Sequence, residues 1–170
     1  MRILGIDPGT ITTGYGVLSN DEETVTVIDY GIISAPVRSP IGERLSFIYA
    51  RLLEVISEHH PDVLAIEQPF VSKNVKSALA VGRSQAIAIL AAARKGIPVY
   101  EYTPAQVKQR VSNYGAGSKE QIQEMVRLQL NLSETPQPDD AADALAVALC
   151  HISETRFSNL LAGQSQEQGH

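Results

Sequence analysis

Two short apolar segments of this chain each end in a carboxylate, and they restrict its fold more than any other feature. Residues 2–6 are mostly apolar and precede Asp7, while residues 63–66 are wholly apolar and precede Glu67. A short continuous apolar run predicts a strand that is covered on both faces. Helices must then lie on both sides of the sheet, which places the chain in the α/β class.

The aspartate at the end of the first segment has two possible roles. Pro8 and Gly9 follow Asp7 and end the strand, because proline lacks an N–H group and glycine favours special backbone angles. An Asp before a Gly often only accepts hydrogen bonds from the turn that follows. However, a carboxylate at the end of a buried strand costs free energy unless another group compensates it. On this segment alone the turn role is favoured. A role in binding a ligand would need support from other segments of the chain.

The order of the patterned segments predicts one mixed sheet. Residues 2–6, 14–18 and 24–30 follow each other closely and predict three antiparallel strands. Strands over 63–66 and 97–100 are separated by a helix, which predicts a right-handed parallel connection. We therefore expect a five-stranded sheet, three strands antiparallel and two parallel, with helices on both faces. Helical patterns begin near residues 40, 77, 104, 119 and 139.

The composition predicts a soluble protein of one domain. Residues 1–157 are expected to form that domain, and the Ser-, Gln- and Gly-rich residues 158–170 a flexible C-terminal tail. Cys150 is the only cysteine, which suits a reducing compartment, and no signal-peptide pattern opens the chain. The longest strongly apolar run, residues 86–93, is too short to span a bilayer. We expect a cytoplasmic protein without a membrane contact.

Positive charge is concentrated in the middle of an acidic chain. The net charge is −5, but residues 68–119 contain eight basic residues and one acidic residue, so this segment is +7. A basic segment on an acidic protein indicates a footprint for nucleic acid, although exposed lysines also serve solubility. Lys119 lies in a first helical turn, where the helix dipole disfavours a cation. That position suggests a lysine kept for a ligand, although an exposed lysine tolerates the cost.

The last helix opens with three aspartates. The helix dipole favours acids in a first turn, which accounts for Asp139 or Asp140. It accounts poorly for Asp143, which lies one turn further in and is flanked by apolar residues. Asp143 shares a helix face with both of the earlier acids, at spacings of three and four. Periodicity therefore leaves open which of the two accompanies Asp143.

Four carboxylates are expected to meet if the strand 63–66 lies beside the first strand. Asp7 and Glu67 are then neighbours, and the last helix can bring Asp140 and Asp143 over them. Two like charges ~4 Å apart repel by ~4 kcal/mol at an effective dielectric constant of ~20, so the set requires protons or bound cations. An all-oxygen set suits Mg²⁺ or Mn²⁺, and the sequence has no Cys/His set with zinc spacing.

The helix expected over residues 77–95 is rich in alanine, and apolar side chains cover much of its circumference. Small side chains permit the close approach of a second helix, which suits a self-complementary dimer contact. A helix wholly buried within a monomer is the alternative. We favour the dimer.

Five ordered motifs together resemble a known family. They are Leu-Gly-Ile-Asp-Pro-Gly (4–9), Thr-Gly-Tyr-Gly (13–16), Ala-Ile-Glu-Gln (65–68), Ala-Gln-Val-Lys-Gln (105–109) and Asp-Ala-Ala-Asp-Ala-Leu-Ala (140–146). An Asp-Pro-Gly motif alone is weak evidence for a family. The ordered set of five motifs is specific, and it covers nearly the whole chain. The chain resembles the RuvC family of Holliday-junction resolvases, in the ribonuclease-H-like superfamily. The register of the last motif favours Asp140 over the additional Asp139.

The resemblance implies a ribonuclease-H-like fold and a structure-specific endonuclease of recombination and DNA repair. Such an enzyme resolves four-way junctions by paired symmetric nicks of opposing strands. Two Mg²⁺ ions per subunit, which Mn²⁺ can replace, would hydrolyse the phosphodiester. The implied metal ligands are Asp7, bridging both ions, with Glu67, Asp140 and Asp143. Lys119 matches a family lysine that stabilises the scissile phosphate.

The resemblance also implies DNA contacts and partners. Lys108 matches a basic residue important for activity, and Phe70 an aromatic that stacks at the opened centre of the junction. With the basic segment, the expected DNA contacts are Phe70, Lys73, Lys76, Lys108, Arg110 and Lys119. A homodimer through the Ala-rich helix suits a two-fold substrate, and the RuvA–RuvB branch-migration complex is an implied partner.

Two other classes compete with this interpretation. A sugar-kinase, actin or Hsp70-like ATPase has a similar Asp-x-Gly-Thr turn, but it needs two related domains and a second phosphate turn. A non-catalytic scaffold would bind junctions without cutting them, and the presence of all four acids argues against it.

Overall fold

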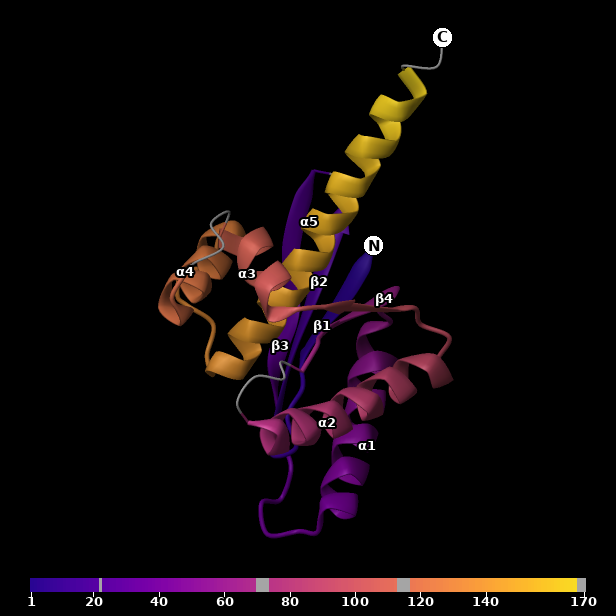
Figure 1. Ribbon diagram of the computed structural model, residues 1–170, viewed down its shortest axis with the longest axis vertical. Coiled ribbons are helices and arrows are strands. Elements are labelled where there is room, and N and C mark those ends of the chain that lie inside the picture. Colours follow the sequence, from indigo (N-terminus) through magenta and orange to yellow (C-terminus); the bar gives the residue numbers. More distant parts are fainter. Residues whose placement is uncertain (22, 70–73, 113–116, 168–170) are drawn as a thin grey trace.

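Five strands form one mixed sheet in the order β3-β2-β1-β4-β5 (Figure 1). The computed structural model describes residues 1–21, 23–69, 74–112 and 117–167. The strands are β1 (Arg2–Asp7), β2 (Thr12–Asp21), β3 (Thr24–Ser34), β4 (Val63–Glu67) and β5 (Val99–Tyr102). β1, β2 and β3 pair antiparallel, β4 pairs parallel with β1, and β5 pairs parallel with β4. The predicted sheet of three antiparallel and two parallel strands is confirmed.

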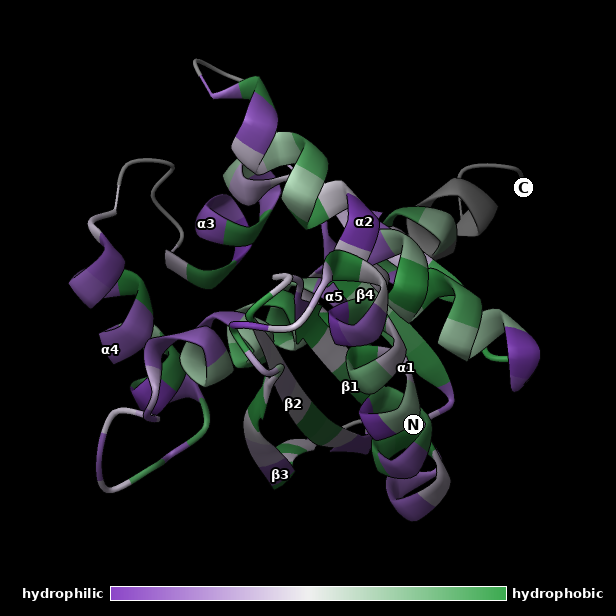
Figure 2. Cartoon of the chain, turned by 90° about the horizontal axis from the view of Figure 1, so that it is seen from below, coloured by the Kyte–Doolittle hydropathy of each residue, from purple (hydrophilic) through white to green (hydrophobic). Residues whose placement is uncertain are grey.

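Helices cover both faces of this sheet, as the sequence predicts. The helices are α1 (Ile41–His59), α2 (Val75–Arg94), α3 (Pro104–Ser112), α4 (Lys119–Gln129) and α5 (Asp139–Glu167). α1 and α2 pack on one face around Leu4 and Leu64, and α3, α4 and α5 pack on the other around Ile3 and Ala65. Ile3 and Leu4 belong to different halves of the core because successive side chains of a strand point to opposite faces. Figure 2 contrasts the largely hydrophobic stretch of α5 with the hydrophilic residues of α4.

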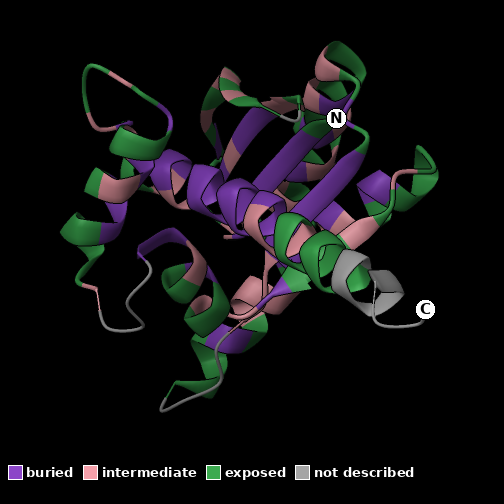
Figure 3. Cartoon of the chain, turned by 90° about the horizontal axis from the view of Figure 1, so that it is seen from above, coloured by how far each residue is buried: buried purple, intermediate pink, exposed green. Residues whose placement is uncertain are grey.

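Glycines on β1 and β2 allow α5 to lie directly on the sheet. A Cβ atom at Gly5 would overlap the backbone oxygen of Ala144, and one at Gly14 would overlap that of Asp140. The helix backbone therefore occupies the space that side chains would fill at these two positions. Figure 3 shows the resulting burial: α5 is buried where it crosses the sheet and exposed towards its C-terminal end.

α5 is longer than the sequence predicts. Residues 158–167 are helical, where the composition predicts a flexible tail. Adding residues to a helix that already exists costs little, and Leu160 and Leu161 are good helix formers. Both leucines are exposed on this projecting part of the helix. The flexibility of the segment stays a prediction.

α2 is the helix, among those described, that is long and apolar enough to cross a membrane by length and composition. The longest strongly apolar run within it, residues 86–93, is too short by itself to span a bilayer. Core helices of soluble proteins meet the same criterion, and Ala88, Ala91 and Ala92 of α2 are buried in the core beneath the sheet.

Candidate active site

Asp7 and Glu67 leave the sheet side by side. β1 and β4 are parallel neighbours with Ile6 opposite Ile66, so the next residue of each strand is one of the two acids. The carboxyl ends of parallel strands meet at the same edge of the sheet. The neighbouring arrangement that the sequence analysis required is therefore present.

The first turn of α5 brings two more acids to this edge. Gly14 of β2 lies opposite Asp7 in the antiparallel ladder. The backbone of Asp140 rests on Gly14, so α5 begins beside Asp7. Asp143 follows one helical turn later, and 31% of its side chain is exposed. The four acids of the predicted set thus come from three elements that meet at one edge.

Burial and neighbouring negative charges raise the pKa of Asp7 and of Glu67. Burial raises the pKa of Asp7 to about 8, with further contributions from the charges of Glu67, Asp143 and Asp140. Burial and the charge of Asp143 raise the pKa of Glu67 to about 7. The positive charges nearby offset this rise only in part, since Lys119 lowers the pKa of Asp7 and Lys108 lowers that of Glu67. Such perturbed groups are typical of sites that bind a ligand or carry out chemistry.

Lys119 contacts the acids of α5 from the start of α4. Its Nζ lies 3.2 Å from Oδ2 of Asp143 and 3.3 Å from Oδ2 of Asp139. A capping box fixes the start of α4: Gln121 N–H donates to the Ser118 hydroxyl, and Ser118 N–H donates to Oε1 of Gln121. Burial raises the pKa of Asp143, and the positive charge of Lys119 only partly opposes that rise. The predicted lysine therefore faces the acidic set.

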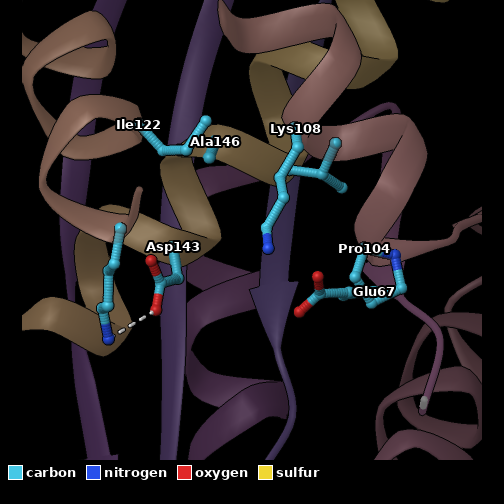
Figure 4. Close-up of a pocket in the computed structure, with 8 residues that line it drawn as sticks. Glu67, Pro104, Lys108, Ile122, Asp143 and Ala146 are labelled. Carbon is cyan, nitrogen blue, oxygen red and sulfur yellow. Dashed lines mark ion pairs between the residues drawn. The ribbon is translucent and has the colours of Figure 1, made fainter. Parts of the chain in front are cut away.

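A cavity of about 340 Å³ opens between α3, α4, α5 and the end of β4. In Figure 4, Lys108 and Glu67 point into the same space, with Asp143 across from them and its ion pair drawn as a dashed line. The charge of Lys108 opposes the rise in the pKa of Glu67. The cavity is lined by Glu67, Pro104, Val107, Lys108, Lys119, Ile122, Asp143 and Ala146. Two acids and two cations thus share one hollow whose remaining lining is apolar.

The turn after Asp7 is held by two buried hydroxyl groups that the sequence analysis did not single out. Thr13 and Ser84 both donate to the backbone oxygen of Gly9, at 2.8 and 2.9 Å. Their side-chain oxygens lie 3.3 Å apart, and both residues are buried. Ser84 belongs to α2, so this helix supports the turn that carries Asp7. Nothing in the local sequence around Ser84 indicates this role, because the contact joins segments 75 residues apart.

The predicted DNA-contacting residues outside the cavity have different surroundings. Lys76 is exposed in the first turn of α2. Arg110 instead forms a salt bridge within the chain, with its Nε 2.7 Å from Oε1 of Glu154. Phe70 and Lys73 lie outside the described residues.

The donor set of this edge fits a hard divalent cation. The acids would supply carboxylate oxygens, which Mg²⁺ and Mn²⁺ prefer as ligands. The negative charge of the acids is incompletely compensated by the lysines nearby. Within the described ranges, no three His, Cys, Asp or Glu side chains are close enough together to hold a metal ion as they stand. Asp143 forms its ion pair with Lys119. Binding a cation would therefore require some of these side chains to turn.

The fold and the acidic edge together are those of a ribonuclease-H-like nuclease. Over residues 3–151 the chain matches the family described as crossover junction endodeoxyribonuclease RuvC. The chain belongs to the RuvC family, whose nucleases need divalent metal ions.

Individual relatives are similar to this chain over almost its full length. The crossover junction endodeoxyribonuclease RuvC of a Dehalococcoides mccartyi strain is 54% identical over 162 residues, which cover 95% of this chain and 97% of that protein. The Chloroflexus aggregans protein of the same name is 51% identical over 151 residues, or 89% and 92% of the two chains. The structure of T. thermophilus RuvC in complex with a Holliday junction substrate is 36% identical, with a TM-score of 0.87 and coverage of 93% and 96%.

Proposed function

We propose that this chain is an endonuclease that resolves four-way DNA junctions by paired nicks of opposing strands, in recombination and DNA repair. The observation that carries the proposal is the meeting of Asp7, Glu67, Asp140 and Asp143 at one edge, with lysines beside them. Family membership supports the same activity, because the relatives are named crossover junction endodeoxyribonucleases.

The four acids would hold two Mg²⁺ ions per subunit, which Mn²⁺ can replace. β1 lies between β2 and β4, so Asp7 stands between Glu67 on one side and Asp140, seated on β2, on the other. This central position supports a bridging role for Asp7. When bound, the ions would activate the attacking water and stabilise the leaving 3′-oxygen.

The two lysines of the cavity would bind the phosphate at which cleavage occurs. Lys119 and Lys108 enter from α4 and α3, and their ammonium groups would stabilise the negative charge that develops on the phosphate. Exposed Lys76 would contact the DNA backbone, as would Lys73 nearby in sequence, and Phe70 would stack on a base at the opened centre of the junction. A DNA contact of Arg110 has less support, since Glu154 already pairs with its guanidinium.

A homodimer through α2 would present two such sites to a two-fold junction. Residues of α2 leave an apolar surface open to solvent, with Leu79 62% and Val75 57% exposed. A groove of about 450 Å³ runs along this surface beside Gly82 and Ala86. A second copy of α2 would cover these side chains and place two active sites in one molecule.

The protein would work in the cytoplasm, where bacterial DNA is found. By family resemblance, the RuvA–RuvB branch-migration complex would deliver the junction to it.

The experiment that tests the proposal is cleavage of a labelled mobile four-way junction in Mg²⁺, with Asp7→Asn as the control. We expect symmetric nicks in opposing strands from the unchanged protein and none from the variant. Junction binding without nicks by the unchanged protein would overturn the proposed activity.

A further inference from the structure

The two acids that open α5 have separate surroundings. Successive residues of an α-helix are about 100° apart around its axis, so Asp139 and Asp140 point in different directions, although both lie near Asp143. The backbone of Asp140 rests on Gly14, and its charge acts on Asp7. Oδ2 of Asp139 instead lies 3.3 Å from Nζ of Lys119. Of the two adjacent acids, one joins the acidic set and the other faces the lysine.

Lys119 is shared between two carboxylates of one helix face. Asp139 and Asp143 are four residues apart, so both reach the ammonium group, at 3.3 and 3.2 Å. The two partners are not equivalent, because Asp143 is one of the proposed metal ligands. Asp143 lines the cavity, whereas 53% of the Asp139 side chain is exposed.

Asp143 cannot serve Lys119 and a metal ion equally well. A cation bound at its carboxylate repels the ammonium group at the same oxygen, and that repulsion is strong at distances of a few ångströms. Lys119 then needs another partner if it is to remain beside the reacting phosphate. Asp139 is already in contact with it and requires no movement of α4 or α5.

We propose that Asp139, which lies outside the proposed metal-binding set, is a positioning residue that holds Lys119 beside the active site. This inference rests on the proposed nuclease function and adds a task for the acid whose role periodicity leaves open. An exposed ion pair is weak. The contact with Asp139 can therefore orient Lys119 without preventing its ammonium group from binding the substrate.

Single-turnover cleavage in a double-mutant cycle tests the contact between Asp139 and Lys119. We expect Asp139→Asn to slow cleavage by roughly tenfold and to leave junction affinity unchanged, since a charge-stabilising group is displaced but not removed. In the Lys119→Met background, Asp139→Asn should cause no further loss. Glu134→Gln removes an equal charge from the exposed segment before α5 and should leave the rate unchanged. A full additional loss in the Lys119→Met background would overturn the inference.

Metal binding distinguishes a positioning residue from a ligand. Mn²⁺ bound in the presence of excess junction, counted by electron paramagnetic resonance, should be the same for the unchanged protein and Asp139→Asn. Asp140→Asn should bind fewer ions. Fewer Mn²⁺ ions on Asp139→Asn would overturn the inference, whereas a failure of the unchanged protein to nick junctions would count against the proposed function.

Discussion

The backbone oxygen of Asp140 occupies the space that a side chain at Gly14 would need. Gly14 is the ladder partner of Asp7, so the missing side chain is what brings the start of α5 down to the first strand. The distance between the acids of the strand and the acids of the helix therefore depends on a residue that has no functional group.

Gly14→Ala should abolish most cleavage and destabilise the fold. The added methyl group overlaps helix backbone, which cannot move away without shifting α5, and overpacking of this kind costs ~1–3 kcal/mol. Urea unfolding and junction cleavage would measure the two effects. Gly42→Ala in α1 is the matched control, because a Cβ there meets nothing within 4 Å. That control should be neutral or more stable. An active Gly14→Ala variant of unchanged stability would contradict the close packing of α5.

The stability of the metal-free protein should fall as the pH rises from about 4 to about 8. The pKa of Asp7 rises from 3.8 to about 8 on folding and that of Glu67 from 4.5 to about 7, so the folded state binds more protons in this range. Stability decreases with pH wherever the folded state holds the additional protons. Asp7→Asn should weaken this dependence.

Asp7→Asn tests whether the ionised carboxylate of Asp7 destabilises the metal-free fold. In EDTA at pH 8, Asp7→Asn should be ~1–3 kcal/mol more stable than the unchanged protein, because a buried charge without a partner is removed. At pH 4 the two proteins should differ little. Urea unfolding at both pH values measures the difference, and Glu134→Gln is the control for loss of a surface charge. A wild-type stability that rises between pH 5 and pH 8 would contradict this account.

Ser84→Ala should reduce cleavage more than junction binding. The substitution removes a hydrogen bond of 2.9 Å to the oxygen of Gly9, in the turn that directly follows Asp7. Thr13 still donates to the same oxygen, so the expected loss of stability is only about 1 kcal/mol. Single-turnover kinetics measure the loss of cleavage, a binding assay measures junction affinity, and urea unfolding measures the loss of stability. Ser77→Ala, at an exposed position of the same helix, should change none of them.

Leu79→Asp should convert the proposed dimer into monomers. Leu79 is 62% exposed on the apolar surface of α2, where a second copy would have to bury a charge. Analytical ultracentrifugation measures the molecular mass. Leu128→Asp, at a residue 54% exposed on α4, is the matched control and should not change the mass. A dimer of undiminished stability in Leu79→Asp would place the subunit contact elsewhere.

Most of the fold could be predicted because its signals are local. The wholly apolar run before Glu67 and the alternating pattern of residues 24–30 depend only on which faces of a strand are covered. The end of α5 was less predictable. The helix continues over residues 158–167, which their polar composition does not indicate, because each added residue extends a helix that already exists.

The candidate site likewise has features that local sequence predicts and features that depend on long-range packing. The chemical groups of the site could be predicted from local sequence: two strands that end in acids, a helix that opens with acids, and lysines in a basic segment between them. The neighbours of these groups follow from the packing of the helices on the sheet. This packing seats Asp140 on Gly14, directs Asp139 to Lys119 and brings Ser84 to the turn after Asp7. These contacts join segments far apart in the chain, so they depend on how α2, α4 and α5 pack on the sheet, which no local pattern encodes.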